Sequence, residues 1–197
     1  MRLIIMYIEN MIGYMIIFLP FYLIGRFIFL KLRRKKIKMI NELLIIIFAL
    51  YLVGLASQTI IPQWDMGVIS DTGEFYFDVN LTTNLSRVNF VPFLTISQYF
   101  FETNTQVDSW NAVSLLNIIA NVFLFSPLGF LTPLIWNKFN SVKKVFILGL
   151  SVTCLIEFTQ FFIGRSTDID DVILNTFGVM IGYGVFFIFY RNRKRIT

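Results

Sequence analysis

The sequence predicts an all-α integral membrane protein with five transmembrane helices, its N-terminus outside the cell and its C-terminus inside. The first observation behind this is composition: 56% of the 197 residues are hydrophobic and only 15% are charged, whereas soluble domains carry about 25% charged residues. The second is a set of five long apolar stretches, and the third is the placement of the basic residues. The chain is expected to form one membrane domain over residues 1–197.

Five segments have the length needed to cross a bilayer. A hydrocarbon core about 30 Å thick requires roughly 20 mostly apolar residues in a helix. The first segment is too long for the apolar region of a signal peptide and lacks a small-residue cleavage site at its end, so we expect it to be retained. The predicted spans cover about residues 3–30, 43–61, 112–136, 145–164 and 172–190.

Charge sets the predicted orientation. Thirteen of the 17 basic residues lie in the segment Lys31–Lys38, in the loop that contains Lys138, Lys143 and Lys144, or after residue 190. With five spans these three regions fall on one side, and short basic loops remain cytoplasmic. The loop over residues 62–111 is then extracytoplasmic. Its apolar residues, among them Phe93, predict that part of it associates with the membrane surface.

Several classes of protein and site are excluded by residue type. The chain has no histidine and a single cysteine, Cys154. An intrachain disulfide, a histidine-based zinc site and a catalytic triad with histidine are therefore ruled out. The pI of 9.4 does not indicate a nucleic-acid partner, because the basic residues flank membrane spans, where topology explains them.

Polar side chains occur inside three of the spans, where they are costly and normally face the bundle interior. Glu157 and Gln160 share one face of the fourth span, and Asn117 and Asn121 share one face of the third. Asp171 begins a similar stripe on the fifth span. Because neighbouring spans run in opposite directions, these groups are expected at similar depths near the extracytoplasmic surface, in one polar pocket formed with Asn175.

The charged segment between the fourth and fifth spans admits three interpretations. Asp168 or Asp170 can cap the fifth helix, with Asp171 favoured at its positive end. Arg165 and the aspartates can instead contact a ligand, since a guanidinium forms paired hydrogen bonds with a phosphate or carboxylate. The third and weakest interpretation is a divalent cation held by Asp168, Asp170 and Asp171; otherwise no cofactor is expected.

Glu157 also has two interpretations. It can be a structural residue that hydrogen-bonds Asn117, Asn121 or Gln160 and locks the helices together. It can equally belong to a ligand-binding or catalytic pocket, because polar residues from three helices exceed what one structural contact requires.

The polar motifs resemble those of the VanZ-like family over about residues 40–190. They are the segments 117–130, Glu157-Phe-Thr-Gln160, 165–175 with Gly178, and Val88-Asn-Phe-Val-Pro-Phe93. The resemblance implies a multi-pass protein of the bacterial plasma membrane, associated in some members with resistance to teicoplanin-type glycopeptides. The ligand-binding residues that it carries over are Asn117, Asn121, Glu157, Gln160, Arg165, Asp168, Asp170, Asp171 and Asn175.

Two functional hypotheses follow, and we favour the first. In the first, a non-enzymatic protein binds a lipid or lipid-linked headgroup and alters how lipid-anchored antibiotics meet the membrane; its partners are membrane lipids, a lipid-linked cell-wall precursor or a lipoglycopeptide antibiotic. In the second, an enzyme modifies a lipid-linked cell-wall or surface-polymer precursor with Glu157 as acid or base, Arg165 on a phosphate, and Asp170 as a third catalytic candidate. A transporter is disfavoured because no inverted repeat is visible, and the oligomeric state is not predicted.

Overall fold

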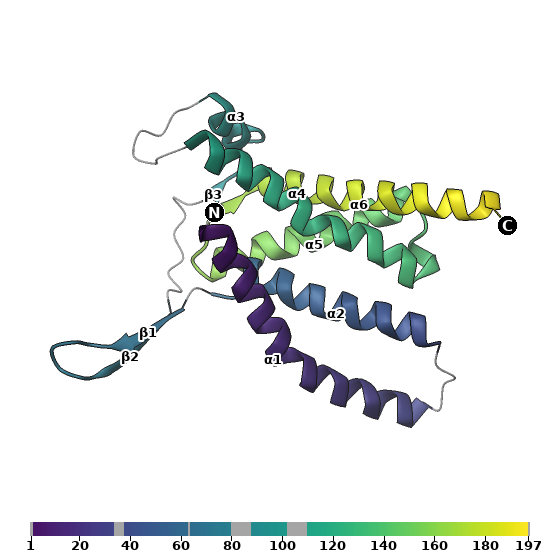
Figure 1. Cartoon of the computed structure of the whole chain (residues 1–197). Helices are drawn as coiled ribbons and strands as arrows, with labels where there is room; N and C mark the ends of the chain where they lie inside the picture. The colour runs from purple at the N-terminus through teal and green to yellow at the C-terminus, as the bar shows by residue number, and fades with distance from the viewer. Residues whose placement is uncertain (1, 34–37, 63, 80–87, 102–109, 197) are drawn as a thin grey trace.

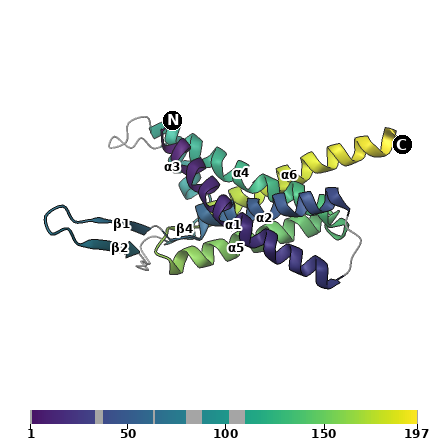
Figure 2. The ribbon, with the colours of Figure 1, turned by 60° about the horizontal axis from the view of Figure 1, so that its bottom comes forward.

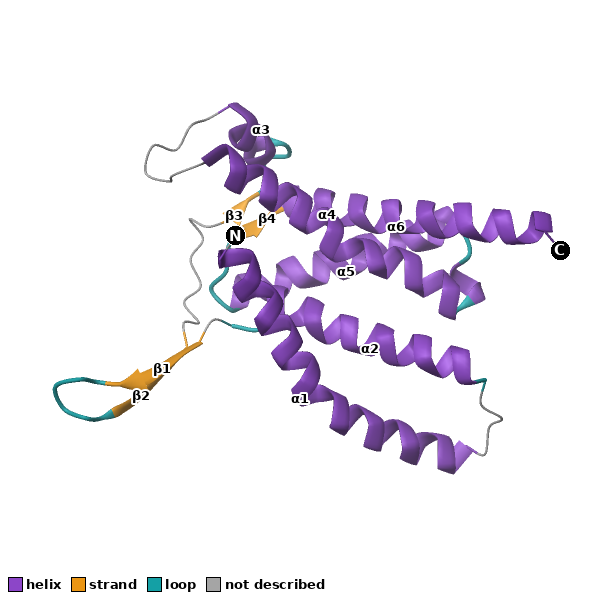
Figure 3. Cartoon of the chain, viewed as in Figure 1, coloured by secondary structure: helices purple, strands orange, loops and turns teal. Residues whose placement is uncertain are grey.

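Five long helices dominate the computed structural model, which describes residues 2–33, 38–62, 64–79, 88–101 and 110–196. They lie side by side, and short strands gather beyond one end (Figures 1 and 3). All five have the length and apolar composition to cross a membrane, which confirms the predicted fold class. The orientation across the membrane stays a prediction. The helices are α1 (Arg2–Arg33), α2 (Met39–Thr59), α4 (Trp110–Ile135), α5 (Val142–Phe162) and α6 (Ile169–Ile196).

The helices begin earlier than the apolar segments indicate. α4, α5 and α6 start at Trp110, Val142 and Ile169, where apolarity alone predicts starts near 112, 145 and 172. The difference has a physical reason: apolarity reports the part of a helix inside hydrocarbon, whereas backbone hydrogen bonding continues into the interface. Asp170 and Asp171 therefore lie in the first turn of α6 rather than in a preceding loop.

α6 is the central helix. It packs most extensively against α4 and next against α5, while α1 packs mainly on α2 (Figure 1). Glycines permit the close contact of α4 with α6, because a Cβ at Gly182 would collide with the Ser126 carbonyl oxygen and one at Gly178 with that of Val122. The small-residue pattern Gly178-x-x-x-Gly182 thus serves packing within the chain.

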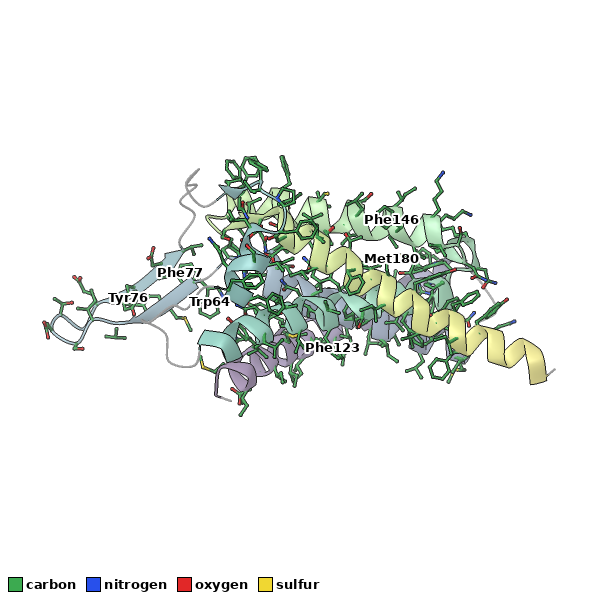
Figure 4. All side chains as sticks on the ribbon, turned by 90° about the horizontal axis from the view of Figure 1, so that it is seen from above. Trp64, Tyr76, Phe77, Phe123, Phe146 and Met180 are labelled. Carbon is green, nitrogen blue, oxygen red and sulfur yellow. The ribbon has the colours of Figure 1, made fainter. Side chains whose placement is uncertain are left out.

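The apolar core lies among α2, α4, α5 and α6, with Phe125, Val145 and Val179 fully buried in it. Many other large apolar side chains cover the outer faces of the helices. Phe123 on α4 is 71% exposed, and Phe146 on α5 also faces outward (Figure 4). Such exposure is unfavourable in water and suits a helix surface in contact with lipid.

An ion pair connects the two helices at the edge of the bundle. Arg26 of α1 donates from Nε and Nη2 to the two carboxylate oxygens of Glu42 of α2, at 2.8 and 2.9 Å. These two charges are therefore matched to each other, as is usual for ionisable groups in or beside a membrane span.

The loop over residues 62–111 contains secondary structure that an all-α prediction did not include. β1 (Trp64–Val68) and β2 (Phe75–Val79) form an antiparallel hairpin that projects from the bundle (Figures 1 and 2). β3 (Val88–Asn89) pairs in parallel with β4 (Thr167–Asp168), just before α6. A short helix, α3 (Leu94–Phe101), follows β3, and a 3-10 turn, η2 (Asn137–Phe139), joins α4 to α5.

The two ends of the bundle differ. The hairpin, α3, the β3–β4 pair and the start of the chain lie at one end, which we call the N-terminal end of the bundle, and the C-terminus lies at the other (Figure 1). The residues expected to contact a ligand come from α4, α5, α6 and the connection before α6. The start of α4, the end of α5 and the start of α6 all lie at the N-terminal end of the bundle.

Candidate functional site

Asp168 connects the start of α6 to the segment that follows β3. One carboxylate oxygen accepts a hydrogen bond from Asn89 Nδ2 at 3.0 Å, and the other accepts one from the Thr95 hydroxyl. The first oxygen also accepts the backbone N–H of Asp170 at 2.9 Å, as a helix-capping residue does. The capping interpretation therefore describes Asp168, which in addition holds a distant segment in place.

The side chain of Asp170 binds backbone N–H groups of the same segment. Its two carboxylate oxygens accept the N–H groups of Phe93, at 2.5 Å, and of Ile96, at 3.0 Å. Phe93 has a φ of 65°, a conformation that costs a non-glycine residue on the order of 1–3 kcal/mol. Asp170, which is 1% exposed, stabilises this turn and the positive N-terminal end of α3.

Glu157 is a structural anchor in this geometry. It is 5% exposed, and its Oε2 accepts the backbone N–H of Asp168 at 2.9 Å. None of the three amides expected as partners forms this bond. Gln160 instead donates to the Thr59 carbonyl at 3.0 Å and so joins α5 to α2.

The remaining predicted polar residues form pairs at the same end. Asn121 donates to Asp171 at 2.8 Å, across the α4–α6 contact, and Asn117 donates to the Tyr99 hydroxyl at 3.5 Å. Partial burial raises the pKa of Tyr99, so this hydroxyl is neutral at physiological pH. Asn175 is buried, and within the described part of the chain its side-chain oxygen accepts no hydrogen bond.

Arg165 lines a different cavity, although its charge acts on Glu157 and Asp171 through space. It lines a cleft of about 600 Å³ between the N-terminal half of α1, the C-terminal end of α2, the base of the hairpin and the end of α5, which we call the α1–α2 cleft. Trp64 and Asp78 of the hairpin form one wall. Arg165 is the one residue of the predicted set that lines this cleft. The other polar and ionisable groups around it are Tyr7, Asn10, Tyr14, Ser57 and Gln58.

The predicted site is thus divided in two. Glu157, Asp168, Asp170 and Asp171, which we call the carboxylate cluster, join α5 and α6 to α4 and to the segment after β3, while Arg165 faces the cleft. Across the residues that the structure describes, no three carboxylates are grouped so that they could hold a metal ion. Both oxygens of Asp168 and both oxygens of Asp170 accept hydrogen bonds from the protein.

A family model described as VanZ/LLP1 matches residues 48–190 of the chain, well over half of its length. The chain belongs to the VanZ-like family. No curated protein and no solved structure matches it. The matched region of this VanZ-like chain includes the carboxylate cluster and its partners on the segment after β3. It begins within α2, so α1 lies outside the family match, and with it one wall of the α1–α2 cleft.

Several residues of these sites were not predicted from the sequence. Asn89 lies in a segment that resembles a motif of the VanZ-like family, but its bond to Asp168 was not predicted, and nothing in the sequence marks Thr95. The sequence of α1 does contain a pattern that indicates its cleft-lining residues. Tyr7, Asn10 and Tyr14 follow one another at spacings of three and four, which places them on a single helix face inside an apolar span.

Proposed function

We propose that this VanZ-like protein resides in the bacterial plasma membrane and lowers susceptibility to teicoplanin-type glycopeptide and lipopeptide antibiotics. It does so by binding a lipid or lipid-linked headgroup at the N-terminal end of the bundle, which the positions of the basic residues predict to face outward. The observation that carries the proposal is the gathering of polar side chains from α3, α4 and α6 at this end, in a chain whose outer helix faces are apolar.

The chemistry of these groups suits a headgroup. Asp171 and Asn121 are only half-buried and Asn117 is exposed, so donors and acceptors remain accessible beside the carboxylate cluster. The exposed apolar faces of the helices provide a surface for acyl chains. A lipopeptide antibiotic carries such a chain, which gives a membrane protein a contact that the bare glycopeptide core lacks.

The alternative is an enzyme acting on a lipid-linked cell-wall or surface-polymer precursor, with Glu157 as acid or base. The geometry gives this less support. One oxygen of Glu157 and both oxygens of Asp170 accept backbone N–H groups, and both residues are almost fully buried. They hold elements of the protein together, and Arg165 lies in a different cleft.

The proposal is tested by antibiotic susceptibility. Cells expressing the protein should show a raised minimal inhibitory concentration for teicoplanin relative to vancomycin, and Asp171→Asn should abolish most of the increase. Asparagine at 171 can still accept the hydrogen bond of Asn121, so the variant removes charge and preserves packing. Asp71→Asn, the same change at an exposed residue of the hairpin turn, is the control and should protect like the wild type.

Lipid analysis separates binding from catalysis. Glu157→Gln retains an acceptor for the Asp168 N–H but cannot transfer a proton at neutral pH. Protection by this variant, with an unchanged set of extracted lipids, supports the binding function. A lipid species that depends on the wild-type protein and disappears in Glu157→Gln cells establishes the enzyme instead. Wild-type behaviour of both the Asp171→Asn and Glu157→Gln variants refutes a functional role for the cluster.

A further inference from the structure

The α1–α2 cleft is not used by the carboxylate cluster, and its composition is unusual for a membrane protein surface. Its volume is about 600 Å³ and most of its lining residues are polar, while the surrounding faces of α1 and α2 are apolar. Polar groups inside an apolar span mark functional sites as a rule. We therefore expect the ligand of this cleft to be polar.

The depth of the cleft indicates where that occupant comes from. Ser57 and Gln58 lie in the last turn of α2, and the apolar span of α1 begins at Ile5. At a rise of 1.5 Å per residue, Tyr7 lies about 3 Å and Tyr14 about 14 Å inside the start of that span. This is the boundary between headgroups and acyl chains, so an amphiphile can enter the cleft from within the bilayer.

Arg165 gives the cleft a positive charge, so its ligand is expected to carry a negative one. The Arg165 side chain is half-buried, and within the described part of the chain the one ion pair joins Arg26 to Glu42. Asp78 lines the same cleft, yet among the described residues it forms no ion pair with Arg165. Glu157 and Asp171 act on Arg165 only through space and not as ion-pair partners. The guanidinium therefore remains available to an external anion, and its fork geometry matches a phosphate.

We propose that the α1–α2 cleft binds the phosphate-bearing headgroup of a membrane lipid. Arg165 contacts the phosphate, and the amide of Asn10 donates a hydrogen bond to an oxygen atom of the headgroup. This site goes beyond the proposed function: it is separate from the carboxylate cluster, one of its walls lies outside the family match, and it does not depend on any role in antibiotic susceptibility.

Two kinds of lipid carry this chemistry, a glycerophospholipid and a polyprenyl diphosphate. Asp78 discriminates between headgroups, because its carboxylate repels further negative charge and attracts an ammonium group. Replacement of Asp78 by Asn should strengthen the binding of phosphatidylglycerol and undecaprenyl diphosphate. The same change should weaken the binding of phosphatidylethanolamine, if that lipid occupies the cleft.

Trp64 allows occupancy of this cleft to be read directly. The chain has three tryptophans, so Trp110→Phe and Trp136→Phe together leave Trp64 as the sole indole fluorophore. The full-length protein is purified in detergent and titrated with phosphatidylglycerol, phosphatidylethanolamine or undecaprenyl diphosphate, with acyl or prenyl chains carrying a bromine quencher near the headgroup. Phosphate-free brominated diacylglycerol is titrated in parallel.

We expect saturable quenching of Trp64 by at least one phosphate lipid and none by diacylglycerol. Arg165→Ala should weaken this binding at least about tenfold, which corresponds to about 1.4 kcal/mol, and Arg165→Lys should retain part of it. Lys143→Ala, which removes one exposed positive charge at the other end of the bundle, is the control and should bind like the wild type.

Equal quenching of the wild-type and Arg165→Ala proteins overturns the proposal, as does quenching by diacylglycerol at the same concentrations. Because no antibiotic enters the measurement, the result is independent of the susceptibility test. If the wild-type protein gives no protection against teicoplanin, or the Asp171→Asn variant protects like the wild type, while phosphate-dependent quenching is intact, the proposed function alone is refuted. Intact protection with no phosphate-dependent quenching refutes the headgroup site alone.

Discussion

At the scale of single residues, the aspartates before and within the first turn of α6 act as acceptors for a distant segment. Asp168 binds the side chains of Asn89 and Thr95, and Asp170 binds the N–H groups of Phe93 and Ile96. Each carboxylate thereby satisfies donors that would otherwise be unpaired in a partly buried position. Together they determine where β3 and the start of α3 lie.

Replacement of Asp170 by Ala should detach this segment. The variant leaves the N–H groups of Phe93 and Ile96 without acceptors, and an unsatisfied buried donor costs about 1–3 kcal/mol. We expect a lower thermal unfolding midpoint in detergent and faster proteolysis near Phe93. Asp170→Asn retains one acceptor oxygen, so its unfolding midpoint and its rate of proteolysis should lie between those of the wild type and Asp170→Ala.

Asp71→Ala is the control for this prediction, since Asp71 is exposed in the hairpin turn and its replacement should leave both measurements unchanged. If Asp170→Ala is as stable and as protease-resistant as the wild type, Asp170 does not hold the segment.

At the scale of elements, the contact between α4 and α6 organises the bundle. Gly129 of α4 faces the Val179 carbonyl, and Gly178 and Gly182 of α6 face the carbonyls of Val122 and Ser126. Absence of a Cβ at these positions lets the two backbones approach closely. The dispersion attraction between closely packed atoms stabilises helix association in lipid, where the hydrophobic effect contributes little.

A matched pair of glycine substitutions tests this contact. Gly182→Ala should lower the thermal unfolding midpoint in detergent, because overpacking a tight contact costs typically about 1–3 kcal/mol. Gly184→Ala, two residues further along α6, meets no atom within 4 Å. It should be neutral or stabilising, since alanine favours a helix by about 1 kcal/mol over glycine.

Equal midpoints for the two alanine variants would contradict the role assigned to the α4–α6 contact. A larger loss for Gly184→Ala would contradict it as well.

The hairpin is an element of a different kind. Trp64, Met66 and Val68 pair across it with Val79, Phe77 and Phe75, so one face is apolar. Trp64 and Phe77 stack with their ring centroids 6.2 Å apart (Figure 4). Trp64 also donates to the Tyr14 hydroxyl at 3.0 Å, which attaches the base of the hairpin to α1 and forms one side of the cleft.

At the scale of the whole molecule, membrane orientation determines which compartment the candidate sites face. The two ends of the bundle differ in charge: Lys138 in η2 and Lys143 and Lys144 at the start of α5 lie at one end, and the hairpin with Asp71 and Glu74 lies at the other. The basic end is predicted to be cytoplasmic. Both candidate sites would then face the outer leaflet.

Cysteine labelling tests this orientation. Cys154 is the sole cysteine, so a Cys154→Ser background allows one new cysteine at a time. In intact cells Asp71→Cys should react with a membrane-impermeant maleimide, whereas Lys143→Cys should react only after permeabilisation. The reverse pattern would place the N-terminus inside and would remove both sites from the outer leaflet.

The fold class, the number of spans and the end of the bundle at which the polar side chains gather all follow from the order of the residues. These properties are local: an apolar stretch of sufficient length becomes a helix in a membrane, and helix spacing places its polar residues at a given depth. The helix ends were less accurate, because apolarity does not report the turns that extend into the interface.

The contacts between those polar groups, in contrast, come from the packing of the folded chain. Asp168 meets Asn89 across 79 residues, and Asp170 meets Phe93 across 77; such pairs depend on the path of an intervening loop and three helices. The same holds for Arg165, which shares a short segment with the aspartates yet faces α1 and α2. Depth follows from the sequence of each helix alone, whereas the direction of a side chain around the bundle follows from how all the helices pack.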